Sequence, residues 1–279
     1  MENYYLGFQK IDQYTSLALD EVLTEHAIDG DNFIRMFEIS PPAVTVAINE
    51  DLSDINESFI RAHGIHLTRR QTVGSAIYCD HRVFCLSIAS PTANYSNPED
   101  VHLKLASRIA QALRDLGAPP LYIGNWFSIR TTEKTHAPNV LAGFSVDWNT
   151  KSVLYHGVIM KFKQNPDFLN QLIRLRKGEL KYIEQLPTLE DIIKVNDELL
   201  LRQKILERLT DGKYTQMPVD EYEDLMEKAR ELASAKYMNP NWISSGIVRP
   251  NDKRPHLQKG LGYCLADLFY PESKVYRVI

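Results

Sequence analysis

The segment from residue 69 to residue 80, RRQTVGSAIYCD, combines two arginines, a run of small residues and a terminal acid. Small residues let backbone N–H groups approach an anion closely, and a guanidinium binds a carboxylate or a phosphate through two hydrogen bonds. Gly74 can adopt a positive φ, whereas the β-branched Val73 resists it. Because adjacent strand residues point to opposite faces, at most one of Arg69 and Arg70 faces a ligand. The segment is therefore either a ligand-binding loop or an ordinary surface hairpin.

A second group of residues in and after this segment carries thiol, carboxylate and imidazole groups. The donors that could bind zinc are Cys79, Asp80, His81 and Cys85. Zinc normally takes four ligands, and the remaining cysteine, Cys264, lies far along the chain. Unpaired cysteine usually packs as a small hydrophobic residue. We therefore expect buried thiols in strands and no metal.

His156 interrupts the otherwise apolar segment VLYHGVIM at residues 153–160. An imidazole in this position could act as the base in a reactive site, or it could be a buried histidine with a satisfied hydrogen bond. The sequence leaves both interpretations open. Trp242, in the segment NPNWISSG, has the size to anchor the C-terminal part of the chain by packing.

Helices and strands must position these groups. The apolar spacing predicts helices over residues 12–27 and 100–116, and Gly117 suits the end of the second helix. Between and after them lie β-rich segments at residues 33–39, 43–48, 76–79, 83–89, 140–147 and 153–162. Ser40-Pro41-Pro42 predicts a hairpin-like corner between the first two segments, and residues 148–151 predict the turn of a second hairpin.

The C-terminal part has a helical character. A helical pattern runs from about residue 189 to residue 209. Farther along, Val219, Tyr222, Met226 and Ala229 share one face of another expected helix. The order of helix, strands, helix, strands and helices predicts an α+β fold, with a mixed or antiparallel sheet flanked by helices and a helix-rich C-terminal portion.

The composition of the 279-residue chain is that of a globular protein. Hydrophobic residues make up 44% of the chain and charged residues 24%, with a net charge of -4. This charge gives no general attraction to nucleic acid or to an anionic membrane, so we expect neither as a partner. We see no signal peptide and no segment long enough to span a bilayer. With only three cysteines, the chain suits a reducing compartment, and we expect a cytoplasmic protein.

Several motifs occur together in a fixed order. They are SLALDEVL (16–23), PPAVTVAINED (41–51), RRQTVGSAIYCD (69–80), NVLAGFS (139–145), LYHGVIM (154–160) and NPNWISSG (239–246). In this order the chain resembles lipoate–protein ligases and the related octanoyl- and lipoyltransferases, over roughly residues 5–250. Several weak motifs in the right order are far more specific than any one alone.

The resemblance implies a mixed α/β catalytic domain related to that of biotin ligases, with an acyltransfer activity. Family members attach lipoate or octanoate to a lysine of lipoyl-domain proteins, which are 2-oxoacid dehydrogenase subunits and the glycine-cleavage H protein. The ligases use ATP and magnesium to form an acyl-adenylate. The transferases take the acyl group from acyl carrier protein or from another lipoyl domain, some through a cysteine thioester. An accessory subunit could also take part.

The resemblance also implies a domain organisation and a set of site residues. We expect a catalytic-type domain at 1–180, a helix-rich portion of the same unit at 181–250, and an unassigned tail at 251–279. The residues expected to bind the acyl group or adenylate are Arg70, Thr72, Val73, Gly74, Ser75, Ala76, Cys79, Asn125, Gly143, His156 and Gly157.

The chain departs from the family pattern at the positions that would touch the reacting group. Active members carry three glycines and then a His-Asp pair in the first arginine motif. Here the glycine positions are Val73, Gly74 and Ser75, and the histidine is Cys79. The family lysine that polarises the acyl carbonyl or binds adenylate phosphate is Val140. Loss of one such group typically lowers a rate by about 10²–10³.

Further departures concern the neighbouring loop. The Asn-Asp pair of the family is Asn125-Trp126 here, and no cysteine lies between Cys85 and Cys264, where thioester-forming relatives keep their nucleophile. Lys134 lies six residues before the position of the family lysine and could replace it if its loop folds over the site.

Two hypotheses follow. In the first, the chain is a lipoate ligase or a lipoyl- or octanoyltransferase with a displaced catalytic cation. In the second, it is a catalytically silenced homologue that binds lipoyl domains, lipoate or a partner subunit. The first requires a lysine, arginine or histidine within hydrogen-bond reach of the acyl carbonyl, and the second predicts none.

Overall fold

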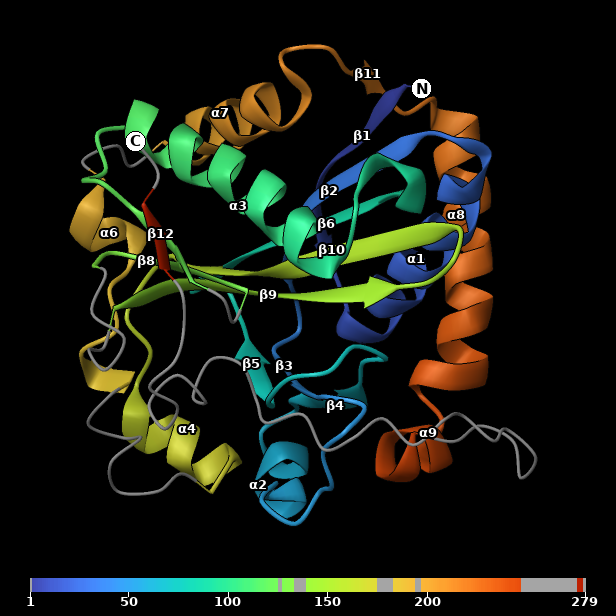
Figure 1. Ribbon diagram of the computed structural model, residues 1–279. Coiled ribbons are helices and arrows are strands. Elements are labelled where there is room, and N and C mark those ends of the chain that lie inside the picture. Colours follow the sequence, from blue (N-terminus) through green and yellow to red (C-terminus); the bar gives the residue numbers. More distant parts are fainter. Residues whose placement is uncertain are drawn as a thin grey trace.

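The computed structural model describes residues 2–124, 127–132, 139–174, 183–193, 197–246 and 275–277. Within them, a nine-stranded sheet has the order β11-β1-β2-β6-β10-β9-β8-β7-β12, and a three-stranded sheet has the order β4-β3-β5. The small sheet lies to one side of the large one, below it in Figure 1. The predicted α+β fold with a mixed sheet is confirmed, because both sheets contain parallel and antiparallel strand pairs.

The strands of the large sheet are β1 (Asn3–Ile11), β2 (Asn32–Ile39), β6 (Val83–Pro91), β7 (Tyr122–Gly124), β8 (Ser128–Arg130), β9 (Val140–Trp148), β10 (Ser152–Met160), β11 (Thr215–Gln216) and β12 (Val275–Arg277). The strands of the small sheet are β3 (Ala43–Val46), β4 (His66–Arg69) and β5 (Ile77–Cys79). The β9–β10 hairpin forms as predicted, with its turn after Trp148.

The helices are α1 (Gln13–His26), α2 (Glu57–Ala62), α3 (Pro98–Asp115), α4 (Pro166–Leu172), α6 (Leu189–Ile192), α7 (Glu198–Thr210), α8 (Val219–Leu232) and α9 (Pro240–Ser245). A π-helical turn, Ala233–Tyr237, continues α8. Helices α3 and α7 cover one face of the large sheet, whereas α1 and α8 lie on the other (Figure 1).

Local chemistry explains the two long helices that were predicted. The side chain of Asp12 caps α1 by accepting a hydrogen bond from the backbone N–H of Thr15 at 3.0 Å. In α3, Asn97 is the N-cap and Pro98 begins the helix, where its missing N–H costs nothing. Gly117 follows α3 with φ of 91°, a conformation that favours glycine. Both helix predictions are confirmed.

Three local expectations are wrong. Ser40-Pro41-Pro42 does not form a hairpin, because β2 belongs to the large sheet and β3 to the small one. The pattern over 189–209 is not one helix, since Ile193 has extended backbone angles between α6 and α7. On α8, Val219 does not join the apolar face, because it begins the helix and is 73% exposed. In each case the tertiary arrangement overrides the local pattern.

Trp242 anchors the C-terminal helices, as its size predicts. Its side chain is fully buried, and its indole N–H donates to the backbone carbonyl of Arg69 at 2.7 Å. Tyr237 packs edge-on against the indole ring, with 6.0 Å between ring centroids. The end of the arginine-bearing strand β4 is therefore fixed by the helices. None of the helices in the described ranges is long and apolar enough to cross a membrane.

Gly157 gives a stability prediction, because its paired strand β9 leaves no room for a Cβ at this position. A Cβ at this position would lie 2.2 Å from the carbonyl oxygen of Gly143 and 2.7 Å from the Cα of Phe144. We expect Gly157→Ala to lower the free energy of unfolding by about 1–3 kcal/mol, since neighbouring backbone must shift. Urea unfolding followed by circular dichroism measures this, and an unchanged midpoint would contradict the close approach of the two strands.

Candidate functional site

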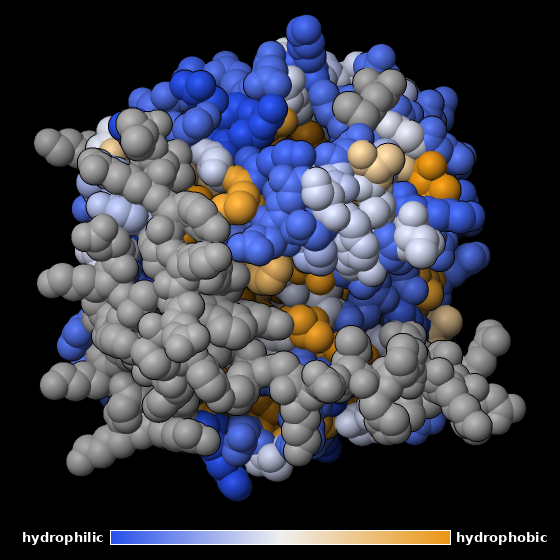
Figure 2. Space-filling view, viewed as in Figure 1, coloured by the Kyte–Doolittle hydropathy of each residue, from blue (hydrophilic) through white to orange (hydrophobic). Residues whose placement is uncertain are grey.

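A cavity of about 240 Å³ lies between the large sheet, the small sheet, α1 and α4. Most of its wall is apolar, with Leu17, Phe37, Val83, Val158 and Leu169 among the residues that line it. Where Figure 2 is not grey, the surface is mostly hydrophilic, and apolar side chains show in the middle of the view and at its right side. The cavity suits a narrow apolar ligand.

Most of the residues predicted to bind an acyl group meet at this cavity. Those that line it are Arg70, Val73, Gly74, Ser75, Ala76, Cys79, Gly143, His156 and Gly157. Thr72 is not among the lining residues, but its hydroxyl oxygen lies 2.8 Å from Nε2 of His156. Asn125 and Lys134 lie outside the described residues, so their predicted roles stay predictions.

The segment after Arg70 is not a surface hairpin, so that alternative is wrong. Strands β4 and β5 do not pair with each other, because each lies on one side of β3. The loop between them, residues 70–76, forms part of the cavity wall. Gly74 has φ of 136°, and its N–H donates to Oδ1 of Asn49 at 3.1 Å. Val73 does not adopt a positive φ, as its branched side chain predicts.

The two adjacent arginines diverge, as strand geometry predicts. The Arg69 guanidinium donates to backbone carbonyls of Ala47, Glu50, Ile243 and Ser244, away from the cavity. Burial lowers the pKa of Arg69, and the nearby Glu50 partly offsets this effect.

Arg70 instead lines the cavity and organises its loop. Its guanidinium donates to the carbonyls of Thr45 at 3.3 Å, Val73 at 3.4 Å and Ser75 at 2.9 Å. The side chain therefore holds the loop against β3 while it presents a positive charge at the cavity wall.

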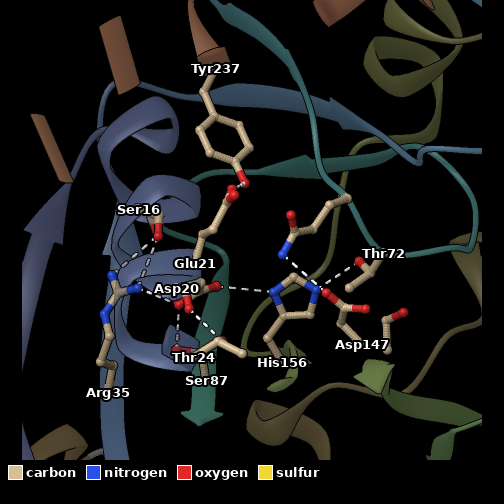
Figure 3. Close-up of polar contacts among 12 residues, drawn as sticks. Ser16, Asp20, Glu21, Thr24, Arg35, Thr72, Ser87, Asp147, His156 and Tyr237 are labelled. Carbon is tan, nitrogen blue, oxygen red and sulfur yellow. Dashed lines mark hydrogen bonds and ion pairs between the residues drawn. The ribbon is translucent and has the colours of Figure 1, made fainter. Parts of the chain in front are cut away.

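A row of polar side chains crosses the large sheet and reaches the cavity wall at His156. The strand register places Arg35 opposite Ser87, and Ser87 opposite His156, on neighbouring strands β2, β6 and β10. Asp20 projects onto this row from α1, and its carboxylate accepts hydrogen bonds from Arg35 at 2.5 Å and Ser87 at 2.6 Å (Figure 3). Oδ2 of Asp20 lies 3.0 Å from Nδ1 of His156. One buried carboxylate thus joins a helix to three strands.

The charge on Asp20 determines which ring nitrogen of His156 carries a hydrogen. Burial by itself raises the pKa of Asp20, but Arg35, His156 and Ser87 lower it more, so its pKa lies below the ordinary value. The ionised carboxylate accepts only, so Nδ1 of His156 carries a hydrogen. When the ring is neutral, Nε2 is then an acceptor for the hydroxyl of Thr72. His156 is both a hydrogen-bonded buried histidine and a residue of the cavity wall.

The thiols behave as buried residues of strands. Cys79 and Cys85 are both free, buried and part of the cavity wall. A hydrogen bond with Cys79, together with burial, raises the pKa of Cys85 well above its ordinary value, so its thiolate is scarce. In the part of the chain that the structure describes, no group of three or more His, Cys, Asp or Glu side chains is arranged to hold a metal ion.

A second polar network links the C-terminal helices to the cavity loop. Lys236 donates to Glu21 at 2.5 Å and to the side chain of Gln71 at 3.2 Å, and Tyr237 donates to Glu21 at 2.7 Å. Gln71 in turn donates to Asp147 on β9 at 3.0 Å. The sequence did not predict this network, or the roles of Asp20 and Arg35, because the partners lie far apart along the chain.

Val140 lies at the position where the family resemblance places a lysine, and that assignment stays a prediction. Its side chain is buried and lines the cavity at the start of β9. Its register partner on β8 is Arg130, which is fully buried and whose Nε donates to the hydroxyl of Ser128 at 3.1 Å. Among the described residues of the cavity wall there is no lysine, and the groups that can carry a positive charge are Arg70 and His156.

Comparison with known proteins identifies the family. The family model described as the lipoyl protein ligase A/B catalytic domain matches residues 12–199. The chain belongs to this family. The match begins at the cap of α1 and ends at the start of α7, so it includes every described residue that lines the cavity.

Two curated relatives match shorter segments. Octanoyltransferase LipM of Moorella thermoacetica is 32% identical over 118 residues, which are 39% of this chain and 41% of that protein. Lipoate–protein ligase 1 of Staphylococcus aureus is 28% identical over 107 residues, 38% of this chain and 32% of that protein. The chain spans less than half the length of these relatives.

Solved structures match a larger share of the chain than the curated relatives do. The bi-partite lipoate protein ligase of Thermoplasma acidophilum superimposes with a TM-score of 0.73 at 17% identity, over 88% of this chain and 98% of that chain. A lipoate-protein ligase A bound with ATP has a TM-score of 0.72 at 18% identity, over 88% of this chain and 100% of that chain. At these identities the likeness concerns the fold, and it confirms the predicted fold class.

Replacing the buried carboxylate tests its role in the fold. We expect Asp20→Asn to lower the free energy of unfolding by about 3–5 kcal/mol, because it leaves the Arg35 guanidinium buried without a counter-charge. The matched control is Asp211→Asn, which breaks an exposed pair with Arg108 and should cost about 1 kcal/mol or less. Urea unfolding of both variants measures the difference, and equal effects would contradict a central role for Asp20.

The pKa of Asp20 also predicts an acid dependence. Because this pKa is lower in the folded chain, the carboxylate stabilises the fold fully above the unfolded-state pKa of about 3.9. That contribution is lost as the pH falls through the lower, folded-state value. We therefore expect the stability gap between the natural chain and Asp20→Asn to shrink below about pH 4. Urea unfolding over a pH series measures this gap, and a constant gap in acid would oppose the assignment.

Proposed function

We propose that this chain is an acyltransferase of lipoyl metabolism, which holds a lipoyl or octanoyl group in the cavity and transfers it to a lysine of a lipoyl-domain protein. The observation that carries the proposal is the cavity itself. Its wall is mostly apolar, and residues from the arginine, NVLAGFS and LYHGVIM motifs meet in it although they lie far apart in the sequence. An acyl chain of this class is narrow and apolar, which is what such a wall binds.

The relatives support the acyl class. The proteins of Moorella thermoacetica and Lysinibacillus sphaericus are named octanoyltransferases, and that of Staphylococcus aureus is named a lipoate–protein ligase. A Thermoplasma acidophilum structure of this fold holds bound lipoic acid, and the bi-partite lipoate protein ligase of the same organism was analysed together with its E2 lipoyl domain. We therefore propose lipoyl-domain proteins as the acceptors for this chain, with acyl carrier protein or an accessory subunit as further partners.

In this proposal the wall residues have separate roles. The loop Val73–Ala76 covers the acyl chain, and Arg70 fixes that loop through its hydrogen bonds to backbone carbonyls. His156, oriented by Asp20, presents Nε2 toward Thr72 beside the chain. The cation that polarises the acyl carbonyl is then Arg70 or, from the loop outside the described residues, Lys134.

The donor we expect is a carrier-bound acyl group. ATP and magnesium belong to the ligase form of the reaction, in which the adenylate phosphate needs a positive partner. In the described wall, only Arg70 and His156 can carry a positive charge, and the lysine position is Val140. These residues fit an acyl chain better than a triphosphate.

The alternative is a catalytically silenced homologue that binds lipoyl domains, lipoate or a partner subunit. The observation that favours it is Val140, a buried apolar residue at the position of the family lysine. Arg70 and His156 at the cavity favour the active form, because the silenced form needs no charged group near the acyl carbonyl.

An intact-mass assay separates the two. The purified chain is incubated with an apo lipoyl-domain protein and either octanoyl acyl carrier protein, or lipoate with ATP and magnesium. The octanoyltransferase of Moorella thermoacetica and a known lipoate ligase serve as positive controls. We expect the acceptor to gain an octanoyl mass from the carrier without ATP. An ATP-dependent gain would instead make the chain a ligase.

Variants make the assay specific. If Lys134 supplies the missing cation, Lys134→Ala should lower the transfer rate by about 10²–10³. No transfer in either arm, with controls active and acceptor binding measurable, would support the silenced homologue. In that case Val140→Lys should restore transfer if the lost cation is the cause.

A further inference from the structure

Among the described residues, two buried polar oxygens in the cavity wall have no hydrogen-bond partner. They are Oε1 of Gln13 and Oγ1 of Thr45, and the residues are 7% and 1% exposed. Neither oxygen is hydrogen-bonded to any residue in the described ranges. Buried polar groups are nearly always paired, because leaving one unpaired destabilises the fold. The two oxygens therefore require a partner that is not part of the described protein.

Both residues belong to the same part of the wall. Gln13 begins α1, and the next residue, Tyr14, packs with a tilted ring against His66 of β4, with 4.6 Å between ring centroids. This contact holds the first turn of α1 against the small sheet. On β3, Val44 packs against Ile60 and Leu172. The alternation of side chains directs Thr45 to the opposite face of the strand, where it lines the cavity.

A neighbouring threonine shows that the fold satisfies such a hydroxyl where no cavity is involved. Thr68 on β4 is the register partner of Thr45 and is equally buried. Its hydroxyl donates to the backbone carbonyl of Tyr237 at 2.9 Å. Of the two paired threonines, the one that lines the cavity is the one whose oxygen lacks a partner.

We propose that Gln13 and Thr45 form a polar subsite that accepts a hydrogen-bond donor, an O–H or S–H group, carried by the bound acyl chain. The subsite rests on the proposed function of the cavity. An amide oxygen only accepts, so the ligand group must donate. A saturated octanoyl chain has no donor, and neither has the dithiolane ring of a lipoyl group. The reduced dithiol form has two S–H donors, and a hydroxylated octanoyl chain has a stronger O–H donor.

Binding of free acids tests the subsite. Isothermal titration calorimetry of the full chain compares octanoate with 6-hydroxyoctanoate and 8-hydroxyoctanoate, and lipoate with dihydrolipoate. We expect at least one hydroxylated acid to bind about 3–10 times more tightly than octanoate, and dihydrolipoate more tightly than lipoate. In Thr45→Val and Gln13→Met these preferences should fall towards equality, while the affinity for octanoate is kept or improved.

Thermal stability without any acid gives an independent readout. Thr45→Val removes an unpaired hydroxyl from a buried site, so we expect its Tm to stay level or to rise by about 2 °C. The matched control, Thr68→Val, removes a hydroxyl that is hydrogen-bonded, so its Tm should fall.

The outcomes are distinct. If no acid binds, the acyl cavity of the proposed function fails, and the subsite fails with it. If all acids bind with equal affinity, the cavity stands and the subsite is overturned. If Thr45→Val loses stability as Thr68→Val does and the preferences are absent, a permanently buried water satisfies the oxygens, which also overturns the subsite. A preference for the hydroxylated acid that both cavity variants abolish supports it.

Discussion

The buried carboxylate of Asp20 is the interaction on which the cavity depends. It projects from α1 onto a row formed by three neighbouring strands, where it is paired with Arg35, Ser87 and His156. A buried charge destabilises the fold unless partners of this kind surround it. The helix α1 and the strands β2, β6 and β10 must therefore stay in one arrangement. The same carboxylate fixes the hydrogen of the imidazole on Nδ1 and leaves Nε2 for Thr72. One electrostatic constraint therefore positions the helix, the sheet and the loop that covers the cavity.

The small sheet and the C-terminal helices complete the cavity from the other side. The indole N–H of Trp242 donates to the backbone carbonyl of Arg69, and the Arg69 guanidinium donates to the carbonyl of Ile243. Lys236 connects Glu21 to Gln71. The side chain of Lys236 is almost completely buried, and its ammonium group lies 4.4 Å from the centroid of the Trp242 ring. Since these contacts bracket the loop after Arg70, residues beyond 230 take part in shaping a wall that lies within the family match at 12–199. The C-terminal helices thus support the site without lining it.

The departures from the family pattern have different physical consequences. At Val73 and Ser75 the loop keeps its place, because Gly74 alone adopts the positive φ and Arg70 holds the carbonyls of its neighbours. Cys79 is accommodated as a buried thiol next to Cys85. Val140, at the position where the family resemblance places a lysine, puts a buried, uncharged side chain in the wall itself. We propose that the departure with the largest chemical consequence lies at this point of the cavity.

The sequence by itself determined the features that depend on near neighbours along the chain. Helical periodicity and capping residues gave α1 and α3, strand alternation gave the divergence of Arg69 and Arg70, and ordered motifs gave the family and the fold class. Tertiary structure alone decided which sheet each strand joins, so the proline corner after β2 was misread as a hairpin. It also decided the partners of Asp20, because Ser87 and His156 lie 67 and 136 residues away. A local pattern records which face of an element is apolar, whereas the pairing of buried polar groups depends on elements that meet only when the chain folds.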